Sequence, residues 1–128
     1  MALITFELEH GLKAVGSDGQ SLLYREVGLR ELNTPDLIDA QLDAEKVVVH
    51  ANGKAVAYTS DVLYGLELLR RQISYIGELP GPIDIKEIRK LHPEDFALIQ
   101  SKAQELDQAL AEELANRIEA RGRSDSAG

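Results

Sequence analysis

Residues 27–41, VGLRELNTPDLIDAQ, contain the junction that decides the fold, because an extended segment ends here and a helix begins. Pro35 suits the first helical position, where its missing N–H has no partner to lose. We expect Thr34 to accept a hydrogen bond from the first helical turn, and Asp36 to lie beside the positive end of the helix dipole. The junction predicts a helix over about residues 35–45. Its expected buried side chains are Leu37, Ile38 and Leu42.

The chain before this junction has the period-2 pattern of a half-buried strand, in which apolar residues alternate with Thr or Glu. A Gly-Ser-Asp-Gly turn cluster at residues 16–19 separates this segment from a second extended run. We therefore predict an antiparallel hairpin of residues 3–15 with residues 22–32. The adjacent Arg30 and Glu31 are expected to lock this hairpin to the following helix.

The segment after the first helix, KVVVHANGKAVAYT at residues 46–59, is ambiguous. Asn52 and Gly53 lie between two runs that favour strands, which is a strong signal for a two-residue hairpin turn. We predict a second hairpin of residues 47–50 with residues 55–58, and an ordered loop is the alternative.

Three further helices are predicted after this segment. Ser60 is a suitable N-cap for a helix over about residues 61–76, whose apolar residues recur at spacings of three and four. A connector rich in Pro and Gly at residues 79–82 precedes a short helix over about residues 85–91. The last helix is predicted from residue 93 to about residue 120, which corresponds to a length of about 40 Å.

These elements predict an α+β fold, in which N-terminal antiparallel β-hairpins pack with about four helices and the C-terminal helix is long and amphipathic. Residues 1–105 are expected to form a compact domain. Residues 106–121 would extend the last helix, and residues 122–128 would form a flexible tail.

The composition excludes several classes of site and partner. The chain of 128 residues has no cysteine, so it has no disulfide, thiol nucleophile or thiolate metal site. Its net charge of −8 argues against a nucleic-acid partner, because phosphate binding requires a basic face. The N-terminus lacks a signal-peptide pattern, and no apolar run reaches the roughly 18 residues of a membrane helix. We expect a cytosolic protein that binds neither nucleic acid nor a membrane.

No motif for catalysis, for a cofactor or for a metal is present in the sequence. The three histidines lie in different segments and form no spaced ligand set: His10, His50 and His92. His92 precedes a proline, so we expect it to cap or fill the turn there. The row Asp36, Asp39 and Asp43 has the spacing to hold a divalent cation, but a solvated helix face is the favoured interpretation. We therefore expect no enzyme activity, cofactor or metal.

Two arginines, Arg70 and Arg71, form a paired basic site with two interpretations. Both side chains can reach Glu67, which lies three and four residues earlier on the same predicted helix. Alternatively, an arginine of this pair anchors an acidic partner.

The last predicted helix carries an apolar stripe that continues past the length the domain requires. Its first half is expected to cover the core, whereas its second half has the pattern of a helix that packs on another helix. Intramolecular packing, self-association and a helical partner are all compatible with this pattern. The candidate contact residues of the second half are Leu106, Leu110, Leu114 and Ile118.

Five short segments follow one another in a distinctive order and spacing. They are EVGLREL at 26–32, TPDLIDA at 34–40, LLRRQI at 68–73, GPI at 81–83 and IRKLHPEDF at 88–96. In this order they resemble the tail assembly chaperones of Mu-like contractile-tailed phages. The resemblance covers about residues 4–105, and residues 47–58 look like an insertion relative to the shortest family members.

The resemblance implies a non-enzymatic chaperone in the host cytoplasm. Such proteins bind the long, mostly helical tape measure protein before the tail tube polymerises around it, help to recruit the tail tube protein, and are absent from the finished virion. In many phages a programmed frameshift makes a longer version, and this chain would then be the short form.

A second hypothesis is an acidic regulatory protein, such as an antitoxin-like dimer that neutralises a basic partner. Its support is the net charge of −8 and the possible C-terminal coiled coil, and it predicts binding that salt weakens strongly. A DNA-binding protein ranks third. The segment 85–98 permits a helix–turn–helix, but Glu94 and Asp95 within it oppose a phosphate backbone.

Overall fold

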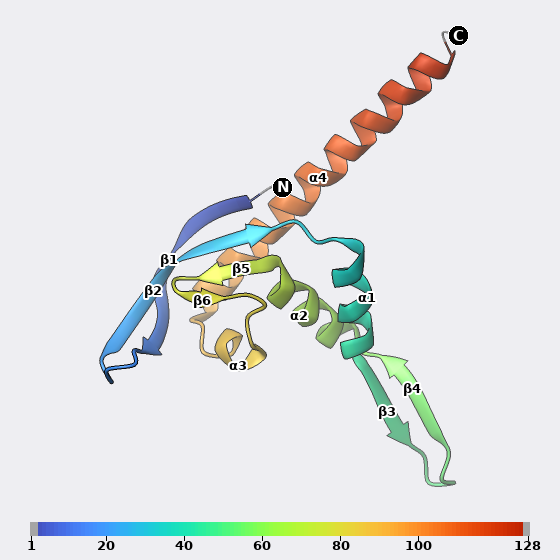
Figure 1. The fold of residues 1–128 in the computed structure, drawn as a ribbon. Coiled ribbons are helices and arrows are strands. Elements are labelled where there is room, and N and C mark those ends of the chain that lie inside the picture. Colours follow the sequence, from blue (N-terminus) through green and yellow to red (C-terminus); the bar gives the residue numbers. More distant parts are fainter. Residues whose placement is uncertain (1–2, 127–128) are drawn as a thin grey trace.

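The computed structural model describes residues 3–126 and has the predicted α+β class (Figure 1). The strands of a four-stranded antiparallel sheet are, in spatial order, β1 (Leu3–Val15), β2 (Ser21–Arg30), β5 (Ile73–Ile76) and β6 (Leu79–Pro80). A separate two-stranded sheet consists of β3 (Glu45–Val49) and β4 (Ala55–Thr59). The helices are α1 (Thr34–Asp43), α2 (Asp61–Gln72), α3 (Ile85–Ile88) and α4 (Pro93–Ser126).

The core lies between the four-stranded sheet and the helices α2 and α4. The fully buried side chains at its centre come from β1, β2, β5 and α4, together with the loop before α3: Leu8, Leu12, Val27, Leu29, Ile73, Ile76, Ile83 and Ile99. α4 crosses behind the sheet and then continues well beyond it (Figure 1). Among residues 3–126, no helix has both the length and the apolar content that crossing a membrane requires.

Both predicted hairpins are confirmed. β1 pairs with β2 over most of their length, and the register shifts once between Glu7 and Leu12. β3 pairs with β4 from Glu45 opposite Thr59 to Val49 opposite Ala55, so this segment is a true hairpin rather than a loop. The predicted two-residue turn is wrong, because His50 pairs with Lys54 and leaves three residues, 51–53, in the turn. This second hairpin projects from the body beyond α1 and α2 (Figure 1).

The predicted helix over residues 61–76 is wrong in its last turn. Ser60 caps α2 as expected, but the helix ends at Gln72 and β5 follows directly. Ile73 and Ile76 are completely buried, and their spacing of three fits a helix face. In a regular strand the two would lie on opposite faces, but the pairing of β2 with β5 shifts register between them, so both reach the core. The open edge of β2 settles the choice, because β5 pairs with it. At Gly28, a Cβ would lie 2.3 Å from the ring of Tyr75, so the missing side chain makes this pairing possible.

The start and the buried face of α1 also differ from the prediction. The N-cap is Asn33 rather than Thr34, and its side chain accepts from the Asp36 N–H while the Asp36 carboxylate accepts from the Asn33 N–H. The helix buries Ala40. The three side chains that were expected inside have exposed fractions of 42%, 54% and 61%, respectively: Leu37, Ile38 and Leu42. Ala40 faces the rest of the domain because Asp36 and Asp43, which lie on the same side of α1, form ion pairs with arginines of that domain.

The last two helices begin as predicted and end differently. Asp84 caps α3, which ends at Ile88 and is shorter than the predicted segment 85–91. α4 begins at Pro93 and continues to Ser126, so it includes part of the segment predicted as a flexible tail. Residues 127–128 of that tail lie outside the described residues. The division of the chain at residues 105 and 121 stays a prediction.

Candidate interaction surface on the last helix

A buried carboxylate fixes the start of α4 against β1. Asp95 is completely buried, and its two oxygens accept hydrogen bonds from the backbone N–H groups of Glu9, His10 and Gly11 at N···O distances from 2.9 to 3.3 Å. These donors lie in the part of β1 where the pairing with β2 shifts register. Hydrogen bonds to an ionised acceptor are stronger than neutral ones. The irregular strand and the helix start therefore hold each other in place.

The four predicted contact residues of α4 lie in two environments. Leu106 is buried in the core, and Leu110 packs against the core while remaining partly exposed. Leu114 and Ile118 have exposed fractions of 58% and 62%. They belong to the half of α4 that extends beyond the sheet, where no described element covers them (Figure 1). The predicted stripe therefore consists of a core half and an open half.

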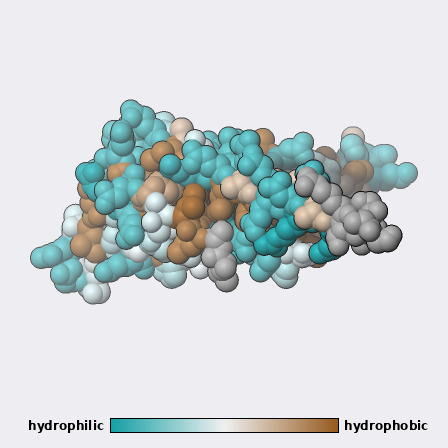
Figure 2. Space-filling view, turned by 90° about the horizontal axis from the view of Figure 1, so that it is seen from above, coloured by the Kyte–Doolittle hydropathy of each residue, from teal (hydrophilic) through white to brown (hydrophobic). Residues whose placement is uncertain are grey.

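A groove of about 660 Å³ lies between α2 and α4. Its apolar lining includes Leu66 and Leu69 from α2 and Phe96 and Ala103 from α4. Apolar surface interrupts the hydrophilic surface of the molecule in the view from above (Figure 2). Exposed apolar surface bordered by polar groups is typical of a protein interaction site.

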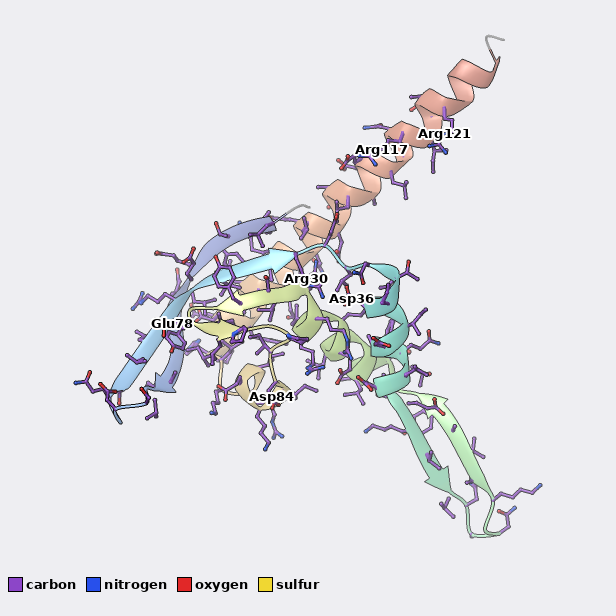
Figure 3. The ribbon with its side chains drawn as sticks, in the orientation of Figure 1. Arg30, Asp36, Glu78, Asp84, Arg117 and Arg121 are labelled. Atoms are coloured by element: carbon purple, nitrogen blue, oxygen red, sulfur yellow. The ribbon has the colours of Figure 1, made fainter. Side chains whose placement is uncertain are left out.

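The groove and the open half of α4 lie on the same face of that helix. Five residues of α4 follow one another at alternating intervals of seven and four residues. These intervals keep side chains on one face of a helix. We call this surface the groove-side face of α4, and it consists of Phe96, Ala103, Asp107, Leu114 and Ile118. Beside it, Arg117 forms an ion pair with Glu113 one turn earlier, and Arg121 lies one turn further out (Figure 3).

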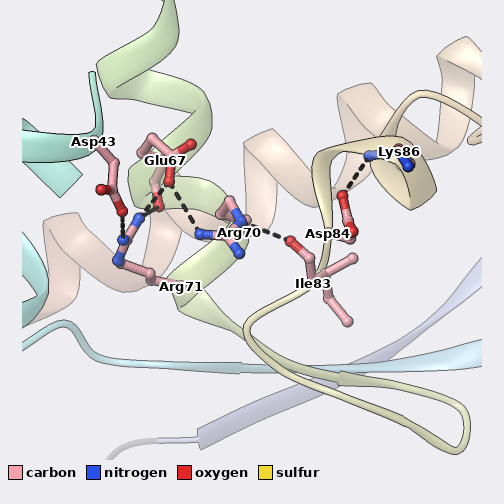
Figure 4. A network of polar contacts seen from close by, with 7 residues as sticks. All are labelled: Asp43, Glu67, Arg70, Arg71, Ile83, Asp84 and Lys86. Carbon is pink, nitrogen blue, oxygen red and sulfur yellow. Dashed lines mark hydrogen bonds and ion pairs between the residues drawn. The ribbon is translucent and has the colours of Figure 1, made fainter. Parts of the chain in front are cut away.

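The arginine pair belongs to a network inside the domain (Figure 4). The Arg71 guanidinium is buried and hydrogen-bonds both to the Glu67 carboxylate, at 2.6 Å, and to the Asp43 carboxylate of α1. Arg70 donates to Glu67 at 3.0 Å and to the carbonyl of Ile83 at 2.9 Å. The predicted ion pairs with Glu67 are therefore confirmed. Because both guanidinium groups have intramolecular partners, the open half of α4 is the stronger candidate for contact with another protein.

An ion pair outside this network joins the first hairpin to α1. Arg30 donates to both oxygens of Asp36 at 2.8 and 2.9 Å, and the two side chains point toward one another (Figure 3). The predicted lock between hairpin and helix is therefore made by Arg30. Two members of the aspartate row, Asp36 and Asp43, pair with arginines. The interpretation of that row as a solvated face is wrong for Asp36, whose side chain is largely buried, whereas the Asp43 side chain is 56% exposed.

The Arg30 pair gives a prediction for the acid range. The hydrogen bond from Arg30 lowers the pKa of Asp36 below its ordinary value of 3.8. A carboxyl whose pKa is lowered by folding stabilises the protein above its unfolded pKa, and that contribution is lost as the pH falls through the folded pKa. We expect Asp36→Asn to reduce the free energy of unfolding by about 1–2 kcal/mol at neutral pH, as measured by urea denaturation. The difference from wild type should shrink below about pH 4, and a constant difference would contradict the assignment.

Two histidines that the sequence separated lie together in the structure. The rings of His10 and His92 stack with centroids 3.6 Å apart, and Glu94 lies beside them, so the three side chains could supply ligands to a metal ion. The stacked rings are nearly parallel, so their in-plane lone pairs do not converge on one point. The His92 Nδ1 also accepts from the Glu94 N–H, as expected of a capping residue. The arrangement fits a stacked cap better than a metal site.

The comparison with known families decides the identity of the chain. The family model for the tail assembly protein gp41 matches residues 8–123. The chain belongs to this family. The Mu-like prophage FluMu protein gp41 of Haemophilus influenzae is 44% identical over 102 residues, which are 80% of this chain and 77% of that protein. The probable tail assembly protein gp41 of Escherichia phage Mu is 40% identical over 108 residues, which are 84% of this chain and 74% of that protein.

Membership of the gp41 family confirms the resemblance to Mu-like phage tail assembly proteins. The family match continues past residue 105 and includes Leu114 and Ile118, so the open half of α4 belongs to the matched region. Asp95 lies within it as well. No solved structure matches the chain significantly.

Proposed function

We propose that this chain is a non-enzymatic tail assembly chaperone that binds the tape measure protein in the host cytoplasm before the tail tube forms. The tail tube protein would be its second partner. The observation that carries the proposal is the groove-side face of α4, which begins in a groove of the folded domain and continues along a helix that no described element covers. The family membership supplies the assembly context.

The shape of this face suits a helical client. From Phe96 to Ile118 the face extends for about 33 Å along α4, at 1.5 Å per residue. An amphipathic helix that lies along it can place apolar side chains in the groove and against Leu114 and Ile118. A specific interface buries about 800 Å² per partner, which a helix of this length can provide. A long helical protein with an exposed apolar stripe is the kind of client that this face can shield.

The charge of the chain suits the same role. The whole chain carries a net charge of −8, and acids such as Glu112 and Glu113 lie beside the open half of α4. A high net charge keeps a complex soluble. The apolar face would cover the client while the acidic surface faces the solvent.

A longer product of the same gene, made by a frameshift, is part of the proposal. A third relative, the probable tail assembly protein FS-gp41 of Escherichia phage Mu, is also 40% identical over 108 residues. These residues are only 56% of that protein, whereas they are 74% of the gp41 of phage Mu. The existence of a longer relative supports a longer product of this kind.

Charge substitutions in the open half of α4 test the binding surface. We expect the double variant Leu114→Asp/Ile118→Asp to weaken binding of the tape measure protein of the same phage at least about tenfold, because each aspartate places a charge in an apolar contact. Both side chains are exposed, so the domain should keep its thermal stability. The affinity is measured by titration calorimetry with the helical region of the client.

The matched control adds the same two charges to the other side of the helix. Ala109 and Ala120 are exposed and lie roughly opposite the groove-side face, so Ala109→Asp/Ala120→Asp should bind as wild type does. Equal affinities for the wild type and both double variants would show that the client does not use this face.

A further inference from the structure

The hairpin of β3 and β4, residues 45–59, leaves a large apolar surface open, and we call it the arm. Every residue of both strands is exposed, and the arm projects from the body (Figure 1). One face of the arm presents Val47 and Val49, and the other presents Val48, Val56 and Tyr58, with exposed fractions between 42% and 68%. A two-stranded hairpin is at best marginally stable alone in water. Apolar side chains on both faces indicate that the arm has a partner.

The outer edge of β4 lacks the features that block pairing with another strand. Natural edge strands are usually protected by charged side chains or proline. β3 carries Glu45 and Lys46, whereas β4 has the sequence AVAYT, with neither charge nor proline. Of the two edges of the arm, that of β4 is therefore the one open to a further strand.

The hydrogen bonds at both ends of the arm fix which backbone groups of β4 point outward. The Ser60 N–H donates to the Ala44 carbonyl, and the His50 N–H donates to the Lys54 carbonyl. Residues of an antiparallel pair alternate between bonded and non-bonded positions. Val56 and Tyr58 therefore bond toward β3. The backbone groups that point away from β3 belong to Ala55, Ala57 and Thr59.

We infer that β4 pairs with β4 of a second copy of this chain, antiparallel and with Ala57 on the twofold axis. The outward N–H of Ala57 donates to the Ala57 carbonyl of the second copy, and Ala55 pairs with Thr59 on each side. The same register places Val56 opposite Tyr58 of the second copy. Pairs of an aromatic and a β-branched residue in such positions stabilise sheets. The result is a continuous four-stranded sheet made of two arms.

The charge distribution makes the arms the least repulsive place for contact between two copies. The three charged residues of the arm, Glu45, Lys46 and Lys54, give it a net charge of +1 in a chain of −8. The rest of the chain therefore carries −9, so two bodies repel one another strongly, whereas two arms, at +1 each, repel only weakly. Contact through projecting arms also keeps the two acidic bodies apart. At such a separation salt screens the repulsion between them.

The size of the contact sets its strength. An edge of five residues buries less than the roughly 1,600 Å² of a standard stable interface. We therefore expect an equilibrium between monomer and dimer that depends on protein concentration. This inference does not depend on the tape measure client, because the groove-side face of α4 takes no part in it.

Sedimentation velocity of the full chain at increasing concentration tests the pairing. The wild type should shift toward a dimer, and Ala57→Pro should weaken this association at least about tenfold, because proline removes an outward N–H that β3 does not use. The control Val47→Pro makes the same change on the outer edge of β3 and should associate as wild type does. A wild type that stays monomeric, or a proline at Val47 that acts as strongly as one at Ala57, would overturn the inference.

A cysteine variant provides a second measurement that does not disturb the strand. Because the chain has no cysteine, Ala57→Cys introduces a single thiol on the proposed twofold axis. Mild oxidation of this variant should give a covalent dimer, because directly opposed residues in a sheet are close enough for a disulfide. The control Val47→Cys should cross-link at least about tenfold more slowly. Equal cross-linking at both positions would contradict the register.

Discussion

Replacing Asp95 with alanine is expected to lower the free energy of unfolding by about 3–5 kcal/mol. The substitution removes the acceptor of the backbone N–H groups of Glu9, His10 and Gly11 and leaves a gap beneath the first turn of α4. Hydrogen bonds to a charged group contribute about 1.5–3 kcal/mol each, and the loss is not fully additive. Urea denaturation followed by circular dichroism measures the change.

The neighbouring acid provides the control for this prediction. Glu94 lies in the same first turn of α4 but is exposed, so Glu94→Ala removes a similar charge from the helix N-terminus. We expect Glu94→Ala to change the free energy of unfolding by less than about 1 kcal/mol. Equal losses for the two variants would mean that Asp95 acts only through the helix dipole.

Replacing Arg71 with alanine is expected to cost about 3 kcal/mol of stability. Glu67 is only 6% exposed, and it would lose one of its two guanidinium partners. The contact from α2 to Asp43 of α1 would be lost as well, so α1 should become more mobile. Amide hydrogen exchange of α1 and urea denaturation of the whole domain measure these two consequences.

A double variant separates the cost of an unpaired charge from the loss of the pair. Glu67→Met/Arg71→Met replaces both groups by apolar side chains of similar length. We expect it to recover a large part of the loss caused by Arg71→Ala, because a buried charge without its partner is the main cost. A double variant that is less stable than Arg71→Ala would instead show that the ion pair itself stabilises the fold.

Local sequence signals predicted the elements whose determinants are local. Asn52-Gly53 located the second hairpin, and Ser60 was recognised as a cap. These signals failed where tertiary contacts decide the type of an element or which of its faces is buried. Ile73 and Ile76 have the spacing of a helix face, and only the open edge of β2, with a register shift between the two residues, selects a strand. The apolar residues of α1 predicted a buried face, but Arg30 and Arg71 pair with two of its aspartates, and Leu42 stays in solvent.

The candidate surface was predictable in part. The spacing of Leu114 and Ile118 was visible in the sequence, and the structure places both on the open half of α4. The groove was not predictable, because it depends on how α2 and α4 pack. The anchor at Asp95 was missed because its donors are about 85 residues earlier in the chain, and an acid in a first helical turn is expected near a dipole in any case.

The tail assembly chaperone role is tested most directly by affinity purification of the tagged full chain from a phage-producing lysate, at moderate and at high salt. The proposal predicts that mass spectrometry identifies the tape measure protein as a recovered partner and that high salt does not remove it, because apolar contacts are not screened. Recovery of only a small basic protein that high salt removes would contradict the chaperone role and favour an acidic regulator.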